Sequence, residues 1–246
     1  MALCAARWSG SRQTAMPRKP IAVVVAMRVE LAPLLARIKM QPLHVDGVEL
    51  FELPEAMVAV GGIGQKHAHH AAEVVIEHAQ PKLLVSAGMA GAISPQLKAG
   101  DVGRIREVVD VATGDRYPTR GGEWVLASSP DVSDVAQKQA WLTKYRADVV
   151  DMEGAAVAQV AKERRLEFAA VKAISDDSGF AMPPLTRFID GNGRFETRQF
   201  LVYVALHPKW WATLGKMRKN SKIASANLCR ELQHLIEDSS QWSTGN

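Results

Sequence analysis

The chain has 246 residues, of which 47% are hydrophobic, 23% charged and 6% aromatic. This is the composition of an ordinary soluble protein, and the length fits one domain with a sizeable core better than two. The net charge of +4 is compatible with an anionic ligand but is too small to indicate nucleic-acid binding.

The cysteines and the N-terminal residues bear on the cell compartment. Cys4 and Cys229 lie far apart, so we expect no disulfide and a reducing, cytoplasmic location. No apolar run reaches the length of a membrane span. Residues 1–19 lack the charge order of a signal peptide and are expected to form a loose tail, with Met16 as an alternative start.

Strands and helices are predicted to alternate over residues 20–246, which we expect to form one domain. A continuous valine-rich run at 21–26 predicts a central parallel strand. Further strands are expected at 48–53, 56–60, 83–86, 100–111, 147–150 and 168–174. Helices are expected at 30–38, 66–79, 131–145, 152–164 and 209–237. This alternation predicts an α/β fold, with a mixed, mostly parallel central sheet flanked by helices.

The predicted connections contain glycine and proline. Glycine turns are expected at 61–64 and 87–92, and a loop at 112–124. Asp131 is a candidate cap for the helix that follows it. A turn-rich insertion at 178–208 precedes the last helix, and it could cover a site or form a subunit contact.

Two acidic residues follow predicted strands. Glu153 comes just after the strand at 147–150, and Asp176 lies at the end of the strand at 168–174. In open α/β sheets, ligands bind outside the carboxyl ends of the strands. We therefore expect Glu153 and Asp176 to face one crevice.

Six short motifs occur in order along the chain. They are AMRVE at 26–30, GIGQK at 62–66, SAGMAG at 86–91, LKAGDV at 97–102, VDME at 150–153 and AISD at 173–176. Together they resemble the purine nucleoside phosphorylase / methylthioadenosine–adenosylhomocysteine nucleosidase superfamily, over most of residues 20–178. The resemblance implies cleavage of the N-glycosidic bond between ribose and a purine, with a 5′-substituted adenosine as the expected substrate and a homodimer as the expected assembly.

The resemblance also implies roles for individual residues. Asp176 matches the acid that protonates the leaving base, since a buried strand-end carboxyl can keep its proton and donate it. Glu153 matches the carboxylate that holds the ribose and stabilises its developing positive charge. Glu30 matches the carboxylate that holds the attacking water. The remaining expected substrate contacts are Met152, Gly88, Met89 and Ser175.

Each acid also has a simpler interpretation. Asp176 could cap a following turn, Glu153 could be an acid in the first turn of a helix, and Glu30 could be exposed at a helix start. Met152 could belong to the core.

The nucleophile could be water or phosphate. A phosphate site needs arginines and backbone N–H groups from glycine turns. Where the phosphorylase branch has an arginine three residues before a serine, this chain has Ser86 and Met89. Water is therefore favoured, although Arg28 lies beside the site and could contact an anion. No metal or organic cofactor is expected, and phosphate would be a co-substrate only in a phosphorylase.

Other features leave alternatives open. The segment from 100 to 151 is shorter than in typical nucleosidases, so no base contacts are predicted. The histidines at 67, 69 and 70 fit a solvated helix face better than a metal site, and the glycines at 61–64 lack dinucleotide-loop spacing.

The basic C-terminal helix, with Trp210 and Trp211, is expected to pack across the sheet. A membrane-surface contact is the less favoured reading. It would suit an adenosylated lipid, such as the substrate of hopanoid-pathway relatives in the superfamily. A non-catalytic nucleoside-binding protein is the alternative from another class.

Overall fold

The computed structural model describes residues 18–37, 41–180, 185–191 and 193–240. The predictions about Cys4 and Met16 lie outside these residues. Lys19, expected at the end of the tail, is buried, and its backbone N–H donates to the carbonyl oxygen of Ala79 at 2.9 Å.

The described residues form strands and helices that alternate along most of the chain. The strands are β1 (Ile21–Val25), β2 (Leu43–Val45), β3 (Val48–Glu52), β4 (Ala56–Val60), β5 (Leu83–Ala92), β6 (Val102–Asp110), β7 (Arg116–Pro118), β8 (Trp124–Ser128), β9 (Val149–Asp151) and β10 (Glu167–Asp176). The α-helices are α1 (Ala32–Leu35), α2 (Gln65–Ala79), α3 (Val135–Tyr145), α4 (Gly154–Arg164), α5 (Thr197–Ala205) and α6 (Trp211–Ser240). Short 3-10 helices are η1 (Arg28–Leu31), η2 (Leu185–Phe188) and η3 (Pro208–Trp210). The predicted α/β class is confirmed.

The ten strands of the described residues belong to one mixed sheet. Its order is β10-β6-β8-β9-β5-β1-β4-β3-β2, and β7 pairs with β6. Because β10 also pairs with β5, the five strands β5, β10, β6, β8 and β9 close into a ring. Strands β1, β4, β3 and β2 extend the sheet from β5 on one side.

Strand β5 has two different neighbours along one of its edges. Its first half pairs with β1, from Leu83 to Ser86, whereas Gly91 and Ala92 pair with β9. Its other edge pairs with β10 along almost its whole length. Backbone groups of β5 between Ser86 and Gly91 therefore face an opening between β1 and β9.

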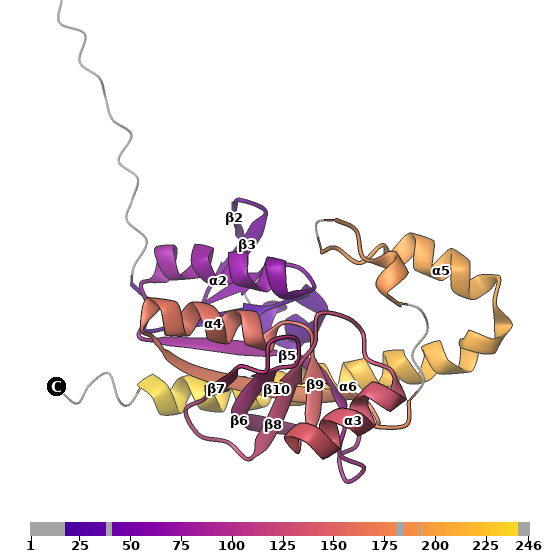
Figure 1. Ribbon diagram of the computed structural model, residues 1–246. Helices are drawn as coiled ribbons and strands as arrows, with labels where there is room; N and C mark the ends of the chain where they lie inside the picture. The colour runs from indigo at the N-terminus through magenta and orange to yellow at the C-terminus, as the bar shows by residue number, and fades with distance from the viewer. Residues whose placement is uncertain (1–17, 38–40, 181–184, 192, 241–246) are drawn as a thin grey trace, which may run out of the picture.

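Helices cover both faces of the sheet (Figure 1). Helices α2 and α4 lie side by side over one face, where their alanines and valines pack against the larger core cluster. Helix α6 runs along the opposite face, where it packs against β10 and β5, and its buried Leu228 and Leu232 belong to the second core cluster. The Ser225 hydroxyl of α6 lies 2.9 Å from the carbonyl oxygen of Glu30, and Asn227 donates to the carbonyl oxygen of Gly100 at 2.6 Å. Helix α6 is therefore bonded to η1 and to the turn before β6.

The predicted insertion contains η2 and α5, and η3 begins at its last residue. A small aromatic cluster around Phe188 and Phe200 holds it together, and α5 lies apart from the sheet in Figure 1. Gly193 accepts a hydrogen bond from the backbone N–H of Ile63 at 2.8 Å, so this segment contacts the glycine turn before α2.

Several element predictions were wrong. Residues 87–92 are not a turn but the second half of β5, and β8 was not predicted. The helix expected at 131–145 begins at Val135, capped by Asp134 instead of Asp131. In place of the helix expected at 30–38, the structure has two short helices, η1 and α1. Residue 38 lies outside the described residues. None of the helices in the described residues is long and apolar enough to cross a membrane.

Candidate active site

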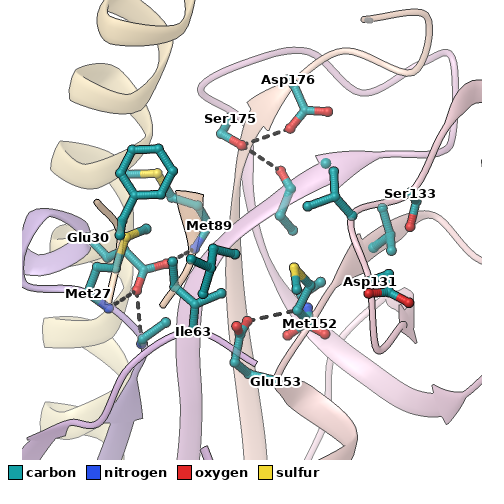
Figure 2. A pocket seen from close by; sticks show the side chains of 18 of the residues that line it. Met27, Glu30, Ile63, Met89, Asp131, Ser133, Met152, Glu153, Ser175 and Asp176 are labelled. Carbon is teal, nitrogen blue, oxygen red and sulfur yellow. Dashed lines mark hydrogen bonds between the residues drawn. The ribbon is translucent and has the colours of Figure 1, made fainter. Parts of the chain in front are cut away.

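A pocket of about 370 Å³ opens between the ends of the strands (Figure 2). Six of the seven predicted site residues line it: Glu30, Met89, Met152, Glu153, Ser175 and Asp176. The seventh, Gly88, is buried beside it. A Cβ atom at this glycine would lie 2.9 Å from Oε1 of Glu30, so the missing side chain makes room for that carboxyl. The structure therefore brings the three predicted acids together.

Glu30 lies at one end of the pocket, held by backbone donors. Its Oε2 accepts from the N–H groups of Ala26 and Met27 at 3.0 and 2.8 Å, and its Oε1 accepts from Met89 at 2.8 Å. The Met89 donor comes from the part of β5 between β1 and β9. Burial raises the pKa of Glu30, and these hydrogen bonds offset part of the rise. The alternative of an exposed acid is wrong, since Glu30 is 4% exposed.

Glu153 lies between the two ends of the pocket. Its Oε1 accepts from the N–H of Gly64 at 2.7 Å. Gly64 belongs to the glycine turn before α2, 89 positions earlier in the chain. Gly64 has φ of +97°, a conformation that side chains disfavour, so a glycine is needed to aim this N–H. Burial and the charge of Asp151 raise the pKa of Glu153 to about 8.

Lys172 was not predicted, yet its charge acts on both Glu30 and Glu153. Its Nζ lies 2.7 Å from Oδ2 of Asp151 and 3.1 Å from the hydroxyl of Ser86, with side-chain exposures of 2% and 0% for the lysine and Asp151. Burial alone would lower the pKa of Lys172, but Asp151, Glu153 and Glu30 raise it. The lysine therefore supplies the positive charge that allows three carboxyls to be close together.

Asp176 lies at the opposite end of the pocket from Glu30 (Figure 2). Its Oδ1 accepts from the hydroxyl of Ser175 at 2.9 Å, and its Oδ2 lies 2.7 Å from Nζ of Lys138 in α3. Both partners of this ion pair are buried, with side-chain exposures of 4% and 5%. A Cβ atom at Gly91 would lie 2.8 Å from Oδ2 of Asp176 and 2.9 Å from Nζ of Lys138, so a glycine is required there. Sequence reasoning missed Lys138.

The segment for which no base contacts were predicted also reaches the pocket. Asp131, Val132 and Ser133, just before α3, line it, and Figure 2 shows Asp131 and Ser133 on the side of the pocket away from Glu30. Asp131 is thus part of the pocket wall and not a helix cap. The remaining wall is largely apolar: Ala26, Met27, Val29, Ile63, Ala90, Val150, Ile189, Phe195, Phe200 and Met217. The last four come from the insertion and α6.

The groups considered for an anion have other partners. Arg28 pairs with Glu49 and lies over the ring of Phe51, outside the pocket. Ser86 is buried against Lys172. Among the described residues, Lys138 is the only basic side chain that lines the pocket, and it pairs with Asp176.

This arrangement combines three chemical functions in one cavity. A proton donor can act at the Lys138–Asp176 end, a carboxyl lies midway, and a second carboxyl lies at the Glu30 end. Positive charge that develops between the two ends would be stabilised by the ionised forms of Glu153 and Glu30. The pocket therefore suits a reaction in which a bond breaks to leave a cation.

The raised pKa of Glu153 predicts a pH-dependent stability. Between its ordinary value of 4.5 and about 8, this carboxyl holds a proton when folded and loses it when unfolded. The native state then binds more protons, so this contribution to the free energy of unfolding decreases as pH rises from 5 to 8. We expect the melting temperature of Glu153→Gln to fall less over this range than that of the unchanged protein. Parallel slopes in thermal melts would contradict the assignment.

Comparisons with known proteins agree with this architecture. A family model described as the phosphorylase superfamily matches residues 20–136 and 116–197. Among solved structures, a futalosine hydrolase of Helicobacter pylori is similar with a TM-score of 0.66 and 17% identity, covering 91% of this chain and 98% of that chain. A 5′-methylthioadenosine/S-adenosyl homocysteine nucleosidase of the same organism gives 0.66 and 18%, covering 92% and 100%. The corresponding nucleosidase of Neisseria meningitidis, in complex with methylthio-immucillin-A, gives 0.64 and 20%, covering 89% and 98%.

Proposed function

The chain belongs to the phosphorylase superfamily, and from this premise we propose that it hydrolyses the N-glycosidic bond of a purine nucleoside. The observation that carries the proposal is the convergence of Glu30, Glu153 and Asp176 on one pocket. We propose a 5′-substituted adenosine as the substrate. An apolar 5′ group would fit the wall formed by Ile189, Phe195, Phe200 and Met217.

In this proposal each end of the pocket acts on a different part of the nucleoside. The purine lies against Asp176, where it is protonated as it leaves. Glu153 contacts the ribose hydroxyls, with Met152 packed on the sugar. Glu30 holds the attacking water on the opposite side of the bond. The two ends thus act on opposite sides of the carbon at which the bond breaks.

Water is the proposed nucleophile because the pocket offers little to a phosphate dianion. Lys138, the one basic side chain among the described residues that line the pocket, is paired with Asp176. The predicted glycine turn could have offered backbone N–H groups to phosphate. Met89 lies in that segment, and its N–H donates to Glu30 instead. Phosphorolysis remains the alternative for this pocket.

Release of adenine tests the proposal. Purified protein is incubated with methylthioadenosine, adenosylhomocysteine, adenosine or inosine, with and without phosphate, and the free base is measured by chromatography. We expect adenine release that does not require phosphate, with free ribose or its 5′-substituted form as the second product. A requirement for phosphate would favour phosphorolysis, and no base from any substrate would leave a nucleoside-binding protein as the explanation. The homodimer implied by the resemblance stays a prediction, which light scattering would test.

A further inference from the structure

The buried ion pair at the Asp176 end joins an unassigned lysine to the proposed reaction. Lys138 projects from α3, is 4% exposed and lines the pocket. An ammonium group has three N–H donors. Within the described part of the chain, Asp176 is the hydrogen-bond partner of Nζ, at 2.7 Å. The remaining donors are available to a ligand in the pocket.

Asp176 is arranged as an acceptor. Its Oδ2 accepts from Lys138 and its Oδ1 from Ser175. The pair therefore presents a donor next to an acceptor. The N7 edge of adenine has the complementary pattern, an acceptor at N7 next to the donor amino group at N6, whereas a 6-oxopurine has two acceptors there.

Resting on the proposed function, we propose that Lys138 is a catalytic residue that gives the leaving adenine its proton. As the C1′–N9 bond breaks, its electron pair moves to the base, and a proton passes from Nζ of Lys138 to N7. Asp176 holds the ammonium group in place and accepts a hydrogen bond from the N6 amino group.

The remaining steps restore the protein. Water forms the new C1′–O bond, and its surplus proton passes to the carboxylate of Glu30. Lys138, left as a neutral amine, regains a proton as Glu30 releases one, both through solvent. The sum is one nucleoside and one water converted to adenine and the free sugar.

A substrate whose leaving group needs no proton isolates this role. 4-Nitrophenyl β-D-ribofuranoside leaves as a stable phenolate, whereas adenine requires protonation. For Lys138→Met we expect adenine release from methylthioadenosine to fall by about 100-fold or more. Nitrophenolate release should stay close to that of the unchanged protein. Lys144→Met, an exposed lysine on the same helix, is the matched control and should change neither rate.

Other outcomes would overturn the inference. Equal losses with both substrates would mean that Lys138 only braces α3 against β10, and an unchanged adenine rate would place the donor elsewhere. If Lys138→Met does not fold, Lys138→Arg keeps a cation beside Asp176, but a guanidinium does not release its proton. The same selective loss is expected there, and full adenine release would refute the role. An unchanged protein that cleaved neither substrate would remove the proposed function and this inference with it.

Discussion

Replacing Asp176 by asparagine is expected to lower the rate of adenine release by about 10²–10⁴-fold, the usual contribution of general acid catalysis, because Asp176 holds the proposed proton donor Lys138 in place. The amide keeps the shape of the carboxyl and can still accept from Ser175. It lacks the charge that holds Lys138, and its NH₂ group can compete for the position of the N6 amino group. Single-turnover measurements with methylthioadenosine would give the loss in the chemical step, apart from any change in binding.

The neighbouring residue provides the matched control. Asp177 lies outside the pocket wall, where its carboxylate accepts from the N–H of Ala99 at 3.0 Å and pairs with Lys216 at 3.1 Å. Asp177→Asn should therefore retain adenine release. We expect Asp176→Asn to fold with a lower melting temperature, because Lys138 loses its buried counter-charge. If Asp176→Asn kept its rate of adenine release and Asp177→Asn lost it, the role proposed for Asp176 would be reassigned to Asp177.

Replacing Lys172 by methionine is expected to cost about 3–5 kcal/mol of stability, because Asp151 would be left buried without its cation. The pKa values of Glu30 and Glu153 should rise further, since the lysine charge lowers both. Chemical denaturation of the purified variant would measure the loss in the free energy of unfolding.

A second variant separates charge from packing. Adding Asp151→Asn to Lys172→Met removes the orphaned charge, while the new amide can still accept from the N–H of Gly154, which lies 2.9 Å from Oδ2 of Asp151. The double variant should recover part of the lost stability. If it is less stable than Lys172→Met alone, the ion pair is not the source of the loss.

The sequence predicted the α/β class and the acids of the site because both follow local patterns. Apolar runs mark buried strands, and Glu153 and Asp176 stand at or just past the ends of such strands, whereas Glu30 was implied by the resemblance alone. It failed for residues 87–92, where glycines suggested a turn. Gly88 and Gly91 lie within β5, and each is small because a carboxyl from another segment occupies the place of its side chain. A glycine required by close approach looks the same in sequence as one required by a turn.

The two lysines of the site differ in how readily they could have been predicted from the sequence. Lys172 interrupts an apolar run that predicts a buried strand, and a charge there signals a buried partner. Lys138 offers no such signal, because it is one of several polar residues in its helix and its partner is Asp176, 38 residues further along the chain. The start of α3 could have been predicted from the sequence, since Asp134 and Gln137 have capping-box spacing.

The bond between Ser225 and the carbonyl oxygen of Glu30 joins residues 195 positions apart. The η1 turn is synthesised well before the helix that braces it. During synthesis, the end of the cavity that is expected to hold the attacking water therefore stays incomplete until α6 has been made. Contacts of such long range form slowly. A nascent chain should therefore gain no activity before α6 has docked, and a chain that lacks α6 should have none.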